Sequence, residues 1–168
     1  MDWAASLAGP LDIDSSTWWM ALGSALAVGF LLGALPVGAA EAIALAAGAI
    51  PSIHMRAGVI VVFTAGHVIG KALWYLLGTL ESQVKRPQLR RWIERARGVT
   101  QRHPGLGLGV TAMSAVLSIP PFHLIAVAGG LVHSPPVPFF AVSFAGRLLR
   151  FGILAAFPSL VRYLFSGG

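Results

Sequence analysis

The hydrophobic positions of this chain fall into a few long, uninterrupted stretches. Residues 17–40 contain no charged residue, and residues 57–80 contain Lys71 as their one charged residue. Residues 103–146 form the longest stretch, 44 residues without Asp, Glu, Lys or Arg. About 20 consecutive apolar residues suffice for a helix to cross a bilayer. The pattern therefore predicts an all-α integral membrane protein.

Prolines interrupt two of these stretches. Pro36 lies inside the first, and Pro120 and Pro121 lie inside the third. Because proline breaks the hydrogen-bond ladder of a helix and leaves carbonyl groups without partners, neither stretch is expected to be one straight helix. We predict a re-entrant helical hairpin at each place, entering and leaving the membrane on the same side.

The chain is predicted to form a single membrane domain over residues 1–168. Its segments are a non-cytoplasmic N-terminal segment (1–16), a first helix and re-entrant hairpin (17–50), a transmembrane helix (57–80), a basic cytoplasmic amphipathic helix (81–104), a second re-entrant hairpin (105–132) and a transmembrane helix (137–164).

The two halves of the chain resemble each other. Ala47-Gly48 corresponds to Ala128-Gly129, and residues 62–67 correspond to residues 142–147. An odd number of crossings between the copies predicts inverted repeats, an arrangement found in many secondary transporters. Gly48 and Gly129 are interpreted, together with the prolines, as positions where the hairpins break.

Composition and charge support a membrane location and suggest an orientation. The chain is 56% hydrophobic and 11% charged, whereas soluble domains carry about 25% charged residues. Seven of the 12 basic residues fall within 81–104, namely Lys85, Arg86, Arg90, Arg91, Arg95, Arg97 and Arg102. This bias predicts a cytoplasmic loop whose helix, 85–102, lies on an anionic leaflet and not on nucleic acid. The alternative is a solvated linker helix without a lipid role.

Charged residues inside the apolar stretches are the candidates for a functional site, since each is costly in hydrocarbon. Glu41 is the candidate for proton coupling or gating; alternatively, it only caps the returning half-helix. Arg147 and Arg150 share a helix face and suit phosphate binding. They could instead form a structural ion pair with Glu41 or extend toward the nearer interface.

Three further residues are weaker candidates for substrate binding: His67, His123 and Lys71. Lone membrane histidines more often make interhelical contacts, and Lys71 could extend to the cytoplasmic interface. The sequence shows no metal-ligand cluster, no nucleophile–base pair and no glycine-rich phosphate loop. We therefore expect neither an enzyme nor a bound cofactor or metal.

Several motifs resemble those of the DedA/VTT (SNARE-associated) superfamily over roughly residues 17–160. Glu41 precedes Ala47-Gly48 at the family's spacing, and Gly70, Tyr75 and Gly78 match the following span. The G-R-x-x-R-F pattern at residues 146–151 is similar to a smaller, divergent branch.

The chain also departs from the family pattern. Ala39-Ala40 replace Pro-Gly, Lys71 stands where Asp is common, and Thr79 stands where Arg is common. Pro120 fits the second hairpin, but His123 occupies the place of an arginine.

The resemblance implies a multi-pass protein of the bacterial plasma membrane that handles lipids. Its expected cargo is an anionic phosphate-bearing lipid, undecaprenyl phosphate or a phospholipid, moved between leaflets by a flippase or scramblase mechanism. An exporter or antiporter of ions or small molecules is an alternative, and a non-transporting membrane scaffold is another. Formation of a homo-oligomer is left open.

Overall fold

The computed structural model describes residues 15–36, 38–80 and 87–166, and within these ranges the secondary structure is entirely α-helical. The seven helices described are α2 (Ser15–Ala34), α3 (Ala40–Ala47), α4 (Ile53–Thr79), α5 (Pro87–Arg102), α6 (Pro104–Leu117), α7 (Phe122–Leu131) and α8 (Pro136–Ser166). Residues 1–14 of the predicted N-terminal segment and residues 81–86 of the predicted basic segment lie outside the described residues.

Local chemistry sets where several helices begin. Pro87, Pro104 and Pro136 each occupy the first position of a helix, where the missing N–H of proline has no intrahelical partner to lose. Ser52 precedes α4, and its Oγ accepts a hydrogen bond from the Met55 amide at 3.4 Å. This cap starts α4 at Ile53, four residues before the predicted start at 57.

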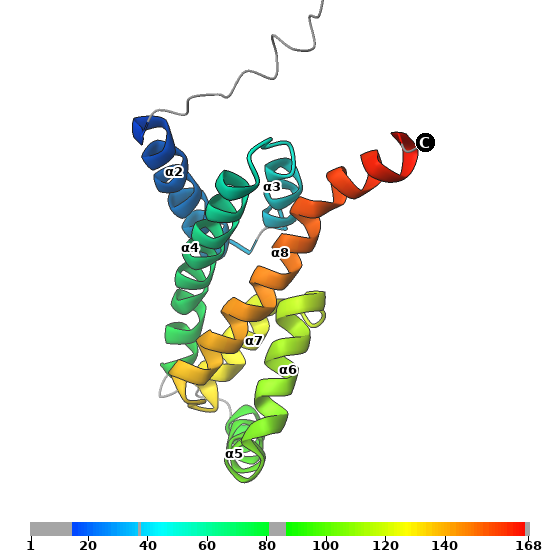
Figure 1. The fold of residues 1–168 in the computed structure, drawn as a ribbon. Helices are drawn as coiled ribbons and strands as arrows, with labels where there is room; N and C mark the ends of the chain where they lie inside the picture. Colours follow the sequence, from blue (N-terminus) through cyan, green and yellow to red (C-terminus); the bar gives the residue numbers. More distant parts are fainter. Residues whose placement is uncertain (1–14, 37, 81–86, 167–168) are drawn as a thin grey trace, which may run out of the picture.

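Helices α2 and α4 run in the same direction, side by side (Figure 1). Gly66 packs against the backbone of Leu26, and the Trp74 indole Nε1 donates to the Ala34 carbonyl at 3.0 Å, so residue numbers rise together in both helices. The chain therefore reverses after Ala34, returns through the short helix α3, and starts α4 at the end of the molecule where α2 also starts.

The second half repeats this course in the opposite direction. Helix α6 rises from the end of the molecule that holds α5, α7 returns beside the lower part of α4, and α8 rises again next to α6 (Figure 1). Arg150 of α8 bonds to Val116 of α6, and Gly146 packs against Ala115. Both chain reversals lie in the middle of the molecule.

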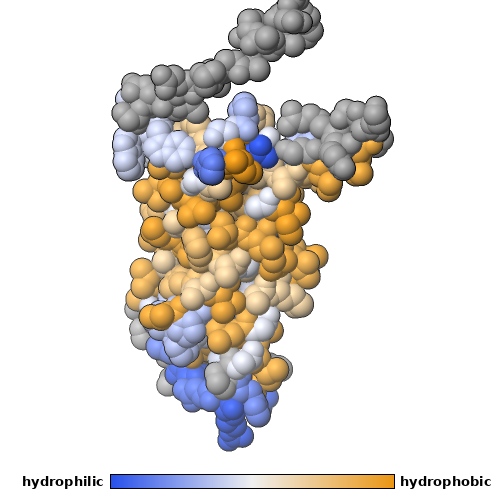
Figure 2. Space-filling view, in the orientation of Figure 1, coloured by the Kyte–Doolittle hydropathy of each residue, from blue (hydrophilic) through white to orange (hydrophobic). Residues whose placement is uncertain are grey.

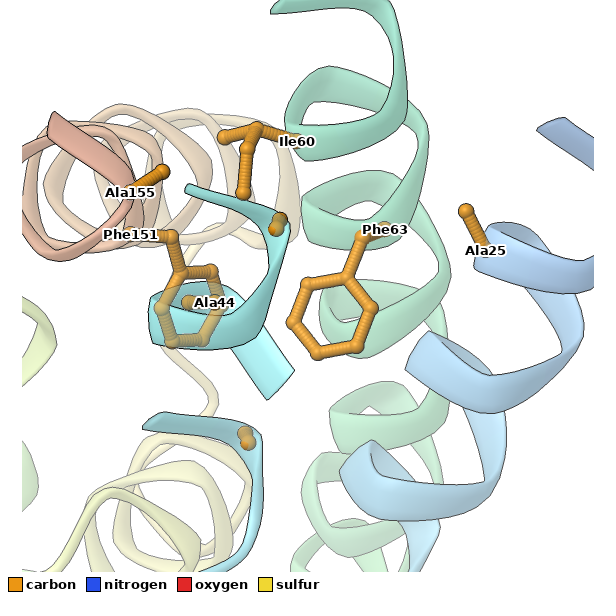
Figure 3. Packing of buried hydrophobic residues seen from close by; sticks show 8 residues of the cluster. Ala25, Ala44, Ile60, Phe63, Phe151 and Ala155 are labelled. Carbon is orange, nitrogen blue, oxygen red and sulfur yellow. The ribbon is translucent and has the colours of Figure 1, made fainter. Parts of the chain in front are cut away.

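Apolar packing holds the first reversal in place. Phe63 of α4 and Phe151 of α8 are fully buried with ring centroids 5.3 Å apart, and Ala44 of α3 lies beside them (Figure 3). A second cluster, around Tyr75, Phe122 and Phe139, packs α7 against α4 and α8. The small alanine side chains of α3 allow this short helix to fit between the longer ones.

The outer surface is that of a membrane protein. Three helices are long and apolar enough to cross a bilayer: Ser16–Ala34, Ile53–Thr79 and Pro136–Pro158. Helices α6 and α7 are apolar but shorter. Figure 2 shows a broad hydrophobic band across the visible face of the molecule, with hydrophilic residues at the lower end where α5 lies. The prediction of an all-helical membrane protein is confirmed.

The prolines and the glycines that were interpreted as hairpin breaks have different roles. Pro36 lies between α2 and α3, and Pro120 and Pro121 lie between α6 and α7. Gly129, in contrast, is inside α7, which continues to Leu131, so that prediction is wrong. A Cβ at Gly129 would lie 2.8 Å from the Phe139 ring, and a Cβ at Gly48, just after α3, would lie 2.5 Å from the Ala155 oxygen. Both glycines permit close packing against α8.

Candidate functional site

A polar cavity of about 160 Å³ lies where the two chain reversals meet. It is bounded by the turn before α3, the middle of α4, the turn before α7 and the middle of α8. Its lining residues are Pro36, Gly38, Ala40, Glu41, His67, Lys71, Ser118, Pro121, Phe122, His123 and Arg147. Because each wall comes from a different part of the chain, the cavity exists only in the folded protein.

Glu41 pairs with both arginines of α8. Its Oε1 lies 3.2 Å from Nη2 of Arg150 and 3.8 Å from Nη1 of Arg147. The Glu41 side chain is 28% exposed, and the Arg147 side chain is 5% exposed. Glu41 also lies in the first turn of α3, where the helix dipole favours a carboxylate. The ion pair that the sequence left as one alternative is therefore present, and it does not exclude a functional role.

The two arginines have further, different partners. Arg150 donates from Nη1 to the Val116 carbonyl at 2.8 Å. The Arg147 guanidinium lies over the Phe122 ring, 4.8 Å from the centroid, and 5.8 Å from the centroid of Phe151. Both Nε atoms are buried without a hydrogen-bond partner. A buried donor without a partner is costly, so the site retains capacity to bind an acceptor such as a phosphate oxygen.

Lys71 points inward and not toward a membrane interface. The residue is 5% exposed, and its Nζ lies 3.5 Å from the Leu35 carbonyl at the end of α2. A cation is favourable at the carboxyl end of a helix, and Trp74 donates to the neighbouring Ala34 carbonyl. The sequence-based alternative, in which Lys71 extends to the cytoplasmic interface, does not fit this placement.

The two histidines line the cavity in different surroundings. His67 is 2% exposed, and neither ring nitrogen has a partner. Its ring packs between Phe63 and Phe151, with centroid distances of 6.2 and 5.5 Å. His123 is partly exposed and lies 5.7 Å from the Trp74 ring, centroid to centroid. His67 is thus a buried polar group that no internal contact of the described chain satisfies.

The structure brings the predicted site residues together. Glu41, His67, Lys71, His123 and Arg147 all line the cavity, and Arg150 reaches it through Glu41. Among the described residues of this site, three Lys and Arg side chains face one acid. The roles of all six predicted site residues in substrate binding and in coupling stay predictions.

Sequence reasoning missed several contributors. Ser118 and Phe122 line the cavity, and Trp74 holds the end of α2. Trp74 lies one helical turn after Lys71, a spacing that places both on one face, and this was the signal that could have found it. No sequence signal marks Ser118, which ends α6 with a positive φ of 58°.

In the described part of the chain, no group of three or more His, Cys, Asp or Glu side chains could hold a metal ion. The expectation that the protein needs neither a metal nor a cofactor stays a prediction.

The fold and the site define a helical integral membrane protein with an ionic cavity between two chain reversals. A family model described as the VTT domain matches residues 15–160. The chain therefore belongs to the VTT domain family and is a membrane protein of the DedA/VTT superfamily. Neither the search of curated proteins nor the search of solved structures finds a match to this chain.

Proposed function

We propose that this protein moves an anionic, phosphate-bearing lipid between the two leaflets of its membrane. The observation that carries the proposal is the charge balance of the cavity. Lys71, Arg147 and Arg150 surround a single described acid, Glu41, deep among apolar helices. Uncompensated positive charge is expensive in such a place, and a phosphate group would both compensate it and occupy the free donors.

The two chain reversals would act as re-entrant hairpins, α2–α3 from one side and α6–α7 from the other. Their tips meet at the cavity, so a movement of either hairpin would open the cavity toward its own side. This is the alternating-access principle of inverted-repeat transporters. Undecaprenyl phosphate and phospholipids are the candidate cargoes implied by the family.

Glu41 would couple this movement to protons or gate it. When charged, it holds Arg150 and Arg147. When it is neutralised, or displaced by a phosphate, the arginines become available to the cargo. An exchange of the carboxylate for a phosphate keeps both guanidinium groups paired throughout, which lowers the cost of moving a charged head group through the membrane.

The proposal is tested by reconstituting the purified protein into liposomes and following a fluorescent phosphate-bearing lipid between leaflets, with and without a pH gradient. Lipid movement above that of protein-free liposomes, abolished by Glu41→Gln, would support it. Absence of lipid movement together with pH-driven flux of a small solute would instead favour the exporter class. If neither is observed, the scaffold alternative gains support.

Membrane sidedness gives a separate prediction. Because the chain has no cysteine, single cysteines report their own position. With α2–α3 as a re-entrant unit and α5 in the cytoplasm, Thr17→Cys and His54→Cys should label from the non-cytoplasmic side with an impermeant thiol reagent. Gln101→Cys should label only after permeabilisation. All three residues are exposed. Labelling of Thr17→Cys and His54→Cys from opposite sides would contradict the hairpin.

A second prediction concerns the shape of the cationic group. Arg147→Lys should reduce lipid transport by about tenfold or more, since a hydrogen bond to a charged group contributes about 1.5–3 kcal/mol and an ammonium does not reproduce the guanidinium fork. Rates are measured in the liposome assay. Arg56→Lys, at the far end of α4 and bonded to the Ile50 carbonyl, is the matched control. Equal rates in the two variants would remove Arg147 from cargo binding.

A further inference from the structure

A second and larger hollow lies away from the central cavity, at the end of the molecule that carries α5. It is a groove of about 470 Å³ between α5, α6, α7 and the start of α8. Its walls are formed mainly by Val99, Leu106, Val110, Ile125, Val132 and Phe139. Volumes of several hundred Å³ with predominantly apolar walls are typical of ligand sites. None of the charged residues of the central cavity reaches this groove.

Two of the three hydroxyl side chains that line the groove, Thr100, Thr111 and Ser134, are already bonded. Thr100 donates to the Ala96 carbonyl and Thr111 donates to the Gly107 carbonyl, each at 2.9 Å and each within its own helix. Since both threonine hydroxyls are already satisfied, the α5 and α6 walls leave little demand for water or for a polar ligand. A hydrocarbon chain is the chemistry that such walls accommodate.

Positive charge borders the groove on the α5 side. Arg95 lines it, and Arg91, one helical turn earlier, is on the same face of α5. Helix α5 contains five arginines against one acid, Glu94. A basic helix at the edge of an apolar belt is the usual arrangement for contact with anionic head groups, and Figure 2 shows this boundary at the lower end of the molecule.

Helix α5 is fixed against the rest of the fold, which makes the groove a built feature. Arg97 donates from Nη2 to the Leu131 carbonyl at 2.9 Å, and the same nitrogen lies 2.8 Å from Nδ1 of His133. Ile93 is buried as well. These contacts join α5 to the end of α7, so α5 forms one wall of the groove at a defined distance from α6 and α7.

We propose that this groove is a site for a resident anionic phospholipid of the leaflet that α5 faces. One acyl chain lies along α6 and α7, and the phosphate lies at Arg95. The site is distinct from the cavity proposed for transport, and its occupant stays bound and holds α5 in place. The proposal does not require that the central cavity transports lipid.

The test uses the full-length protein in a non-ionic detergent, with bound lipids counted by native mass spectrometry. We expect phosphatidylglycerol to be retained in preference to phosphatidylcholine with the same acyl chains. Dodecyl phosphate should compete with it, whereas glycerol phosphate, which has the head group without a chain, should not. Equal retention of the two phospholipids, or competition by glycerol phosphate, would overturn the site as described.

Two pairs of variants locate the site. Val110→Trp should fill the groove and lose the retained lipid, while Met113→Trp, one turn further on α6 and similarly exposed but outside the groove, should keep it. Arg95→Gln should weaken binding of the phospholipid by about fivefold, because one basic residue near an anionic surface contributes about 1 kcal/mol. Arg102→Gln should weaken this binding less.

Each outcome has a defined meaning. Equal losses in Arg95→Gln and Arg102→Gln would indicate general attraction to an anionic surface and contradict a specific site. Retention of the lipid by folded Val110→Trp would also contradict a specific site. If Val110→Trp instead loses a dimer and keeps the same amount of bound lipid, the groove would be assigned to a second copy of the chain. Size-exclusion profiles check folding; if Val110→Trp does not fold, the comparison of lipids in the unmodified protein decides.

Discussion

Glu41→Gln should abolish lipid transport while the protein remains folded and inserted in the membrane. Glutamine keeps the size and hydrogen-bonding shape of the side chain and removes its charge, so the exchange between carboxylate and phosphate can no longer occur. Arg150 retains the Val116 carbonyl, and Arg147 retains the faces of Phe122 and Phe151. The lipid-flip assay in liposomes measures the loss, and size exclusion with circular dichroism checks the fold.

If the ion pair between Glu41 and the arginines has only a structural role, a different result is expected for the same residues. In that case Glu41→Gln should lower thermal stability in detergent, because it removes the acid that both arginines share. Arg150→Gln should lower it less, because Glu41 keeps Arg147 as a partner. The double substitution Glu41→Gln/Arg150→Gln should then be more stable than Glu41→Gln alone, because only Arg147 is left without its acid. Full transport by well-folded Glu41→Gln would reject a coupling role and leave Glu41 as a stabilising acid in the first turn of α3.

Gly78→Ala should be among the most destabilising single-methyl changes in the chain. A Cβ at this position of α4 would overlap the Val127 carbonyl of α7, and a Cβ at Gly130 would overlap the Tyr75 carbonyl in turn. These atoms belong to helix backbones and cannot move aside individually, so α4 and α7 must separate. Overpacking costs about 1–3 kcal/mol, more than the roughly 1 kcal/mol that alanine gains over glycine in a helix. Thermal unfolding in detergent measures the difference.

Gly109→Ala is the matched control. Gly109 lies in α6, and a methyl group added there would have no neighbouring atom within 4 Å. Alanine should therefore leave stability unchanged or raise it by up to about 1 kcal/mol. If the Gly78→Ala and Gly109→Ala variants unfold at the same temperature, close contact between α4 and α7 does not explain why position 78 is a glycine.

The sequence by itself determined the helices and their interruptions. Long apolar stretches and the positions of Pro36, Pro120 and Pro121 are local properties, because helix length in a bilayer and the missing N–H of proline act within a few residues. Glu41 and Arg147 could likewise be identified as candidate site residues from the sequence, because an ionisable residue in an apolar segment is costly wherever that segment packs.

Only the tertiary structure decided which of these residues meet. Glu41 reaches Arg147 and Arg150 because α3 packs against α8, and Lys71 turns inward because α2 ends beside it. Gly129 packs against Phe139 and does not break α7, and Arg97, in the helix predicted to lie on an anionic leaflet, contacts the end of α7. Each of these contacts joins separate helices, and their relative placement depends on side-chain packing between helices, which hydrophobic periodicity does not encode.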